Sequence, residues 1–421
     1  MAFCAELGVS LASELAYPIN TPNEAHFSGE PQTWETALAL ALYGDASESL
    51  SYTVRSTLFY DIYDHLEAID DRPENYGSMN GPIFHSRHAR LALSEAYLDF
   101  SGLGGLWRIG KQQIVWGQAD GLKVLDMVNP QKLETFILDD PEDSRIPLWT
   151  VNAEFQFSMD VSLQALVIPD LTFNENADRG SPYQVTSPQL VPTINGYSSV
   201  FLMDVERPDS NEWEYGLRLS VFYAGWDIRV NYLRHFHDRE VYFQSVDGGA
   251  LTLAPRYEKN HLSGFTASNA VGDVTFRTEV GYSTDTFHLL DTPENGGVWR
   301  SPEVSSVVGI DYQGISNVLL SYQWFASRLT RFHAQVVRAR NVIRHSFMIR
   351  YDVMNDTLTA ELFALHSDDN SDGMIRPSVS YQLNDELNLW GGLDFFYGEE
   401  AGVFGQFDRR DRIVAGAKYS F

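Results

Sequence analysis

The sequence predicts an all-β protein: one transmembrane antiparallel β-barrel of about 18 strands, with one segment folded into its lumen. Apolar and polar residues alternate with a period of two over many segments of strand length. Short turns and long polar connections alternate along the chain. No apolar run approaches the ~18 residues of a membrane-spanning helix, so a protein that crosses lipid with this sequence must do so as a closed barrel.

Composition restricts the possible partners. The chain of 421 residues carries 57 Asp and Glu against 30 Lys and Arg, a formal net charge of −27. This balance argues against nucleic acid, whose phosphates require a basic footprint, and against a protein lying on an anionic membrane surface. The single cysteine, Cys4, excludes an intramolecular disulfide framework.

The N-terminal residues MAFCAELGVS lack the charged and apolar regions of a complete signal peptide. Ala2-Phe3-Cys4 matches the end of a small-x-small cleavage site, so we expect a mature chain whose signal peptide is missing from this sequence. Lipidation of Cys4 is the alternative, which Phe3 disfavours because it is a poor residue before a lipid-accepting cysteine. The expected location is the outer membrane of a Gram-negative bacterium.

The faces of the expected strands support the barrel. Between Trp213 and Tyr223, Leu217 and Leu219 share the apolar face, while Arg218 and Ser220 lie on the other. Tyr and Trp recur near strand ends, as in interfacial girdles: Trp34, Tyr43, Tyr60, Trp213, Tyr223, Trp226, Tyr282, Tyr312, Tyr397 and Tyr419. The segment 89–100 breaks the pattern, since Leu91 and Leu93 share a parity with Glu95 and Asp99, and a β-bulge there would restore it.

Turn residues set the strand count. Eight short turns are expected at Gly44-Asp45-Ala46-Ser47, Gly102-Leu103-Gly104, Met159-Asp160, Gly225-Trp226, Gly272-Asp273, Gly314-Ile315-Ser316, Asn355-Asp356 and Asn384-Asp385. Nine longer connections are expected near 18–33, 62–88, 117–147, 169–212, 236–257, 284–302, 327–341, 367–373 and 398–410. Seventeen connections join eighteen strands, and both termini then lie on the short-turn, periplasmic side. No linker divides the chain, so residues 1–421 are expected to form one domain.

The final strand is the most specific short motif. In RIVAGAKYSF, Ile413, Ala415, Ala417, Tyr419 and Phe421 share one face. A terminal alternating strand that ends on an aromatic residue is similar to the assembly signal of outer-membrane barrels.

The segment 117–147 is the expected constriction. It does not alternate, yet it contains apolar residues that need a place to pack, which indicates a loop folded into the lumen rather than a disordered one. The alternative is that it caps the extracellular mouth. The residues assigned to this constriction loop are Asp120, Asp126, Asn129, Asp139, Asp140, Glu142, Asp143 and Arg145. Lumenal arginines such as Arg55, Arg218 and Arg229 are the expected partners of its carboxylates.

Charged residues on the polar faces are expected to line the pore. They are Arg55, Arg218, Arg229, Arg277, Glu279, Arg344, Arg350, Arg376 and Arg412. Two interpretations stay open: the charges pair across neighbouring strands and fill a wet interior, or they form a ladder that selects solutes.

Motifs for catalysis are weak. The near-pairs His85/His88 and His235/His237 lie at expected strand ends or in loops. His345 and Ser346 are adjacent in a strand and point to opposite faces. The acidic run Asp139–Asp143 either binds a divalent cation or, as we favour, forms a solvated turn or an ion pair with Arg145. The sequence therefore predicts no enzyme, no cofactor and no metal.

The stretches RIGKQQIVWGQADG, LDMVNPQ and FILDDPEDSRIPLW resemble a family of Gram-negative outer-membrane proteins long catalogued as a domain of unknown function, distantly similar to the alginate-export porins. The resemblance is densest from Leu91 to Pro169. It implies an outer-membrane barrel, periplasmic or inner-membrane exporter components as partners, and an organic or lipid-like molecule as cargo.

The expected function is an outer-membrane channel or export conduit for a small organic or lipid-like solute, surrounded by outer-membrane lipid and lipopolysaccharide. The alternative is an outer-membrane barrel enzyme or a surface adhesin. A soluble all-β binding protein is the third class, and it would bury the apolar faces inside.

Overall fold

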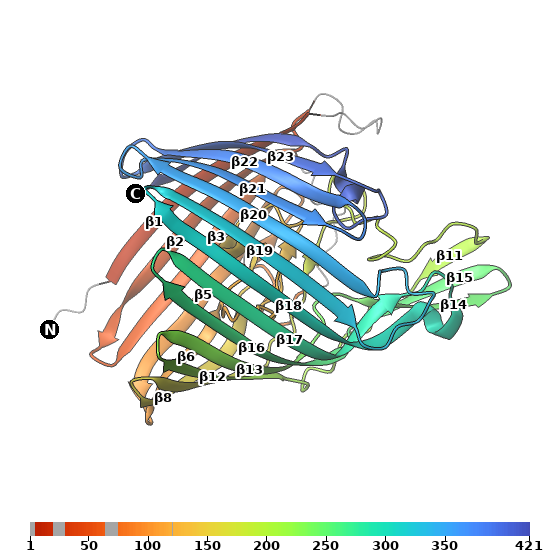
Figure 1. Cartoon of the computed structure of the whole chain (residues 1–421), viewed down its shortest axis with the longest axis horizontal. Coiled ribbons are helices and arrows are strands. Elements are labelled where there is room, and N and C mark those ends of the chain that lie inside the picture. The colour runs from red at the N-terminus through yellow and green to blue at the C-terminus, as the bar shows by residue number, and fades with distance from the viewer. Residues whose placement is uncertain (1–4, 20–29, 64–74, 120) are drawn as a thin grey trace.

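In the computed structural model, residues 5–19, 30–63, 75–119 and 121–421 are described. Within these residues, eighteen tilted strands form one closed antiparallel barrel (Figure 1). The predicted fold class and strand number are therefore confirmed. Cys4 and Asp120 lie outside the described residues. None of the helices in the described ranges is both long and apolar enough to cross a membrane.

The wall strands are β1 (Ala5–Pro18), β2 (Thr33–Ser47), β3 (Leu50–Asp61), β5 (Ala89–Gly102), β6 (Gly105–Gln112), β8 (Leu148–Ser158), β9 (Val161–Ile168), β12 (Glu214–Tyr223), β13 (Trp226–Phe236), β16 (Lys259–Val271), β17 (Val274–Leu289), β18 (Val298–Ile315), β19 (Val318–Leu329), β20 (Asn341–Val353), β21 (Leu358–Ser367), β22 (Asp372–Gln382), β23 (Leu387–Tyr397) and β24 (Arg412–Ser420). Each pairs with the next, and β1 pairs with β24 from Ser10↔Ser420 to Pro18↔Arg412, which closes the barrel. This pairing leaves no open edge between the first and the last strand, as a sheet in lipid requires.

Smaller elements lie in the long connections. They are β4 (Phe84–His85), β7 (Lys132–Leu133), β10 (Glu175–Asn176), the helix α1 (Pro141–Ser144), and the 3-10 turns η1 (Glu294–Gly297) and η2 (Gly405–Phe407). A three-stranded sheet of β11 (Ser199–Leu202), β14 (Val241–Asp247) and β15 (Ala250–Arg256) projects beyond the barrel at the end opposite both termini (Figure 1). The termini lie at the short-turn end, as expected.

The outward face is apolar. Leu219 of β12 points away from the lumen, and its side chain is 40% exposed. Glu279, on the inner face of β17, is fully buried. Many of the expected girdle residues are exposed on the outside: Trp34, Tyr43, Tyr60, Trp213, Tyr223, Trp226, Tyr282 and Tyr312. An apolar surface of this extent outside and a polar interior are the distribution of a barrel in lipid.

The predicted bulge in β5 is confirmed. Arg55 of β3 faces Glu95, but the next residue, Ser56, faces Leu93, so Ser94 is the extra residue. One connection was predicted wrongly. Residues 284–302 were expected to form a long loop, but β17 runs to Leu289 and β18 begins at Val298, so most of that stretch extends the wall.

Candidate functional site

The segment 117–147 lies inside the barrel, and its first half packs against the wall from β8 to β19. Val124, Leu125 and Val128 are buried in one cluster with wall residues. The wall residues of this cluster are Leu148, Leu166, Ile168, Leu233, Leu262, Val307 and Phe325. Burial of these apolar side chains holds the segment in the lumen.

The second half of the segment packs elsewhere on the wall. Leu138 is buried in a cluster with Leu365 of β21, Met374 of β22 and Phe396 of β23, and Phe136 packs against it. Taken together, the two clusters span the wall from β8 to β23, which is twelve of its eighteen strands. The segment therefore crosses the lumen from one side to the other.

Charged lumenal residues bind the backbone of the segment. Glu279 accepts a hydrogen bond from the Gln118 N–H, and Arg277 donates from Nη1 to the Gln118 carbonyl at 2.6 Å. Arg376 donates from Nη2 to the Leu138 carbonyl at 2.8 Å, and Arg218 donates to the Val115 carbonyl at 3.1 Å. Side chains of the wall thus supply hydrogen-bond partners to backbone groups that, in a strand, would pair with a neighbouring strand.

Two of the predicted segment residues fix its internal shape. Asp126 accepts a hydrogen bond from Arg145 at 2.8 Å and forms an ion pair with Lys123 at 3.3 Å. Asn129 accepts from the Ile114 N–H at 2.7 Å and donates to the Ile146 carbonyl at 2.9 Å, so it joins the start of the segment to its end. Arg145 therefore pairs with Asp126. Of the two arrangements that we expected for the run Asp139–Asp143, a solvated turn or an ion pair with Arg145, the ion pair does not form.

That acidic run is exposed. Asp139, Asp140, Glu142 and Asp143 all present their side chains to solvent around α1. Among the described residues, neither of the two apolar clusters includes a residue of β24, β1 or β2. The inner faces of these strands carry Glu14, Glu35 and Lys418, so charged groups lie on both sides of the part of the lumen that the clusters leave open.

The remaining predicted pore residues are placed as follows. Arg55 pairs with Glu95 at 3.3 Å, Arg229 with Asp227 at 2.6 Å and Arg350 with Asp352 at 3.2 Å. Arg376 and Arg412 share Asp394 at 2.7 and 2.6 Å, and Arg344 donates to the Ser367 hydroxyl at 3.2 Å. The expectation that Arg55, Arg218 and Arg229 bind carboxylates of the segment is wrong, because Arg55 and Arg229 pair within the wall and Arg218 binds a carbonyl.

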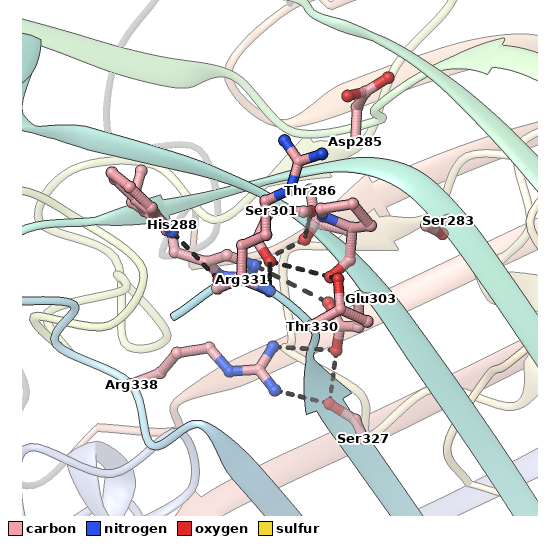
Figure 2. A network of polar contacts seen from close by, with 12 residues as sticks. Ser283, Asp285, Thr286, His288, Ser301, Glu303, Ser327, Thr330, Arg331 and Arg338 are labelled. Carbon is pink, nitrogen blue, oxygen red and sulfur yellow. Dashed lines mark hydrogen bonds and ion pairs between the residues drawn. The ribbon is translucent and has the colours of Figure 1, made fainter. Parts of the chain in front are cut away.

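A cavity of about 410 Å³ lies on the extracellular side of the segment. Leu122, Lys123 and Val124 of the segment line it, together with the connection between β13 and β14, the strands β17 to β20, and Gln189, Leu190, Arg338 and Val403 from other connections. Its polar wall is a network around Glu303, which accepts hydrogen bonds from Arg338 at 3.0 Å and from Ser327 (Figure 2). His288 lies 3.8 Å from Glu303, and apolar residues such as Phe325 also line the cavity.

Sequence reasoning missed His288, Glu303 and Arg338, because it placed them in or beside expected loops. The signal was available: Phe287 and Leu289 alternate with Thr286 and His288, which continues the pattern of β17 beyond the assigned end. The high polarity of the stretch concealed this alternation.

The closed barrel, its apolar outer face and its inward segment define the class of porin-like outer-membrane barrels. Residues 43–305 match a family model described as a protein of unknown function, DUF1302. That match covers more than half of the chain, so the chain belongs to the DUF1302 family. No curated protein sequence matches the chain.

Solved structures share the fold. OpdK of Pseudomonas aeruginosa, in complex with vanillate, is 10% identical with a TM-score of 0.56, over 99% of this chain and 98% of that one. OccAB3 of Acinetobacter baumannii is 10% identical with a TM-score of 0.55, over 99% of both chains. At this identity the likeness shows the fold alone.

One expectation from the sequence is corrected here. We predicted that the protein is not an enzyme, but the similar solved structures include OmpT, an outer membrane protein of Vibrio cholerae, as well as porins. A barrel shared at 10% identity fixes no activity, and the TM-score of 0.45 for OmpT carries no functional argument. The exclusion of enzymatic activity therefore does not stand.

Proposed function

We propose that the protein is an outer-membrane channel that passes a small organic or lipid-like solute, and that the segment 117–147 narrows its lumen. The observation that carries this proposal is the path of the segment, whose apolar contacts span the wall from β8 to β23, twelve of its eighteen strands. A segment held across a barrel in this way reduces the free cross-section without closing the wall.

The solute path follows the part of the lumen that the apolar clusters leave open. It runs from the cavity of about 410 Å³ past α1 and along the inner faces of β24, β1 and β2. The cavity combines an apolar surface with a few polar groups, which is the composition of a site that binds organic molecules. The proposed partners are lipopolysaccharide and lipid around the barrel and periplasmic or inner-membrane exporter components at the short-turn end.

The test replaces residues 120–142 with a short Gly/Ser linker and measures single-channel conductance in planar bilayers. We expect the barrel to fold, as judged by faster migration of the unheated protein on a denaturing gel, and the conductance to rise severalfold. The matched control replaces residues 243–253 in the projecting sheet, which lies beyond the barrel (Figure 1). A folded segment variant with unchanged conductance would show that the segment is not the constriction.

A further inference from the structure

The barrel wall is interrupted beside β6. The ladder between β5 and β6 runs from Gly102↔Gly105 to Ala96↔Lys111, and one residue later β6 ends and the chain turns into the lumen. On the same side of β5, the next partner is β4, where Phe84 faces Leu91 and His85 faces Arg90. Across the part of the chain that the structure describes, residues 92–95 have no ladder partner on this side.

Residues 75–85 cover this interruption, and we call them the wall cover. Only its last residues pair with β5, through Ile83, Phe84 and His85, and side-chain hydrogen bonds hold the rest. Trp149 donates from Nε1 to the Met79 carbonyl at 2.8 Å, and Asn80 donates to the Pro147 carbonyl at 2.9 Å. The Gly77 N–H donates to the Thr172 hydroxyl at 2.9 Å. A few such bonds can open at far lower free energy than a complete ladder.

A groove of about 450 Å³ lies next to the wall cover. Its lining is mostly outward-facing and apolar: Tyr52, Val54, Met79, Ala96, Leu98, Ile109, Trp149, Val151 and Pro169 take part. Small residues form its floor. Gly110 has φ +136°, and a Cβ there would lie 2.1 Å from the Ala96 carbonyl oxygen, so only glycine permits this pucker of the wall.

The wall cover exposes apolar surface beside the groove. Met79 is 54% exposed, Ile83 66% and Phe84 52%. Three large apolar side chains gathered on one short extracellular segment would be unfavourable in water but favourable against hydrocarbon. The cover and the groove therefore present one continuous surface to lipid.

A buried ionic cluster joins the wall cover to the inward segment. Arg90 of β5 pairs with Glu134 of the segment at 3.2 Å and with Glu175 of β10 at 2.8 Å. Tyr76 of the cover donates to Glu175 at 2.8 Å. A movement of the segment therefore changes the contacts that hold the cover.

We propose that the interruption between β5 and β6 is a lateral portal, through which the alkyl chain of a lipid-like solute passes between the outer leaflet and the lumen. The wall cover closes the portal, and the groove binds the chain on the lipid side. Residues 92–95 of β5 have backbone groups without a ladder partner on one side. Such groups are tolerated at membrane depth only where protein covers them or where they line a cavity. This inference rests on the proposed function only for the lipid-like nature of the solute.

The test uses oleate with a photoreactive diazirine on its chain, in vesicles of phosphatidylethanolamine and phosphatidylglycerol. Ala96→Trp fills the groove from its floor without reaching the lumen. Ala364→Trp is the matched control, because Ala364 also faces outward, opposite Phe347 and Ile375. We expect crosslinking of the probe to residues 75–115, and we expect Ala96→Trp to lower it severalfold while Ala364→Trp leaves it unchanged.

A second variant keeps the test decisive if Ala96→Trp fails to fold. Tyr76→Phe removes the hydrogen bond that ties the cover to Glu175, and it should raise crosslinking inside the lumen severalfold. Unchanged crosslinking in both variants, or equal crosslinking around the whole barrel, would overturn the portal. Single-channel conductance separates the two proposals: probe capture at the groove without conductance refutes the channel alone, and conductance without capture refutes the portal alone.

Discussion

Arg277 on β17 donates a hydrogen bond of 2.6 Å from Nη1 to the backbone carbonyl of Gln118, and so fixes the start of the inward segment to the wall. The same guanidinium pairs with Asp311 at 2.8 Å, so its position is itself held. Residues 159 apart in the chain are joined by one side chain.

Arg277→Met should loosen the segment without unfolding the barrel. A hydrogen bond to a charged group contributes about 1.5–3 kcal/mol, which is small against the apolar burial of the segment but enough to raise its local opening roughly tenfold or more. Limited proteolysis should cut within 117–147 faster than in the wild type. Arg350→Met is the control, because Arg350 pairs with Asp352 of its own strand. Equal cleavage in both variants would show that the Arg277 contact does not hold the segment.

The period of two makes a prediction about the lipid face. Leu219→Arg and Val280→Arg should each destabilise the barrel by about 2–4 kcal/mol if they lie near the bilayer midplane, because an outward arginine must be solvated in hydrocarbon. Ser220→Arg and Thr275→Arg, on the lumenal face, should cost far less. The midpoint temperature of the gel-mobility shift measures this. Similar losses on both faces would contradict the assignment of inside and outside.

The sequence was sufficient for the strand count because one face of each strand contacts lipid and the other contacts the lumen. The alternation of apolar and polar residues therefore identifies the strands and fixes their register. It was also sufficient for the bulge in β5, since a regular strand would place the apolar Leu91 and the charged Glu95 on the same face. It failed for residues 284–302, where the strands extend beyond the bilayer. Phe287 and Leu289 still alternate with Thr286 and His288 there, but the many polar residues of the stretch made it read as a loop.

The site was predictable in part. The apolar residues of 117–147 required a partner surface, and the interior of the barrel supplied it. The hydrogen bonds that hold the segment to the wall were not predictable, although the sequence placed both Arg277 and Glu279 in the lumen. Their partners are backbone atoms of Gln118, and only the path of the segment decides which carbonyl meets which arginine.

Asp238 predicts a pH dependence outside the membrane-spanning strands. Burial in the connection after β13 raises the pKa of Asp238 to about 8, and Lys123 of the inward segment opposes this shift only in part. The folded protein therefore keeps a proton that the unfolded chain, with an ordinary pKa of about 3.9, releases. The contribution of this group is complete below about pH 4 and is lost as pH rises toward 8.

Asp238→Asn should flatten this dependence, so that the variant gains stability relative to the wild type as pH rises from 5 to 8. The midpoint of the gel-mobility shift at several pH values provides the measurement. Asp356→Asn, in an exposed turn, should leave the slope unchanged. If the midpoint temperatures of the wild type and of Asp238→Asn change in parallel from pH 5 to pH 8, Asp238 does not keep a buried proton in the folded protein.

The exposed acidic run on α1 predicts the ion selectivity of the pore. Asp140, Glu142 and Asp143 present carboxylates to the open part of the lumen, and Glu14 and Glu35 lie on the facing wall strands. Rings of carboxylates favour cations, so the wild-type channel should prefer K⁺ to Cl⁻ in a KCl gradient. The triple variant Asp140→Asn, Glu142→Gln and Asp143→Asn should lower the K⁺/Cl⁻ permeability ratio severalfold, which shifts the reversal potential toward that of an anion-selective channel. The stability of the barrel should change little, because the three side chains are solvated. Asp247→Asn, on the projecting sheet, is the control and should leave the potential unchanged. A triple variant with the wild-type reversal potential would mean that ions do not pass α1, and the path along β24, β1 and β2 would have to be abandoned.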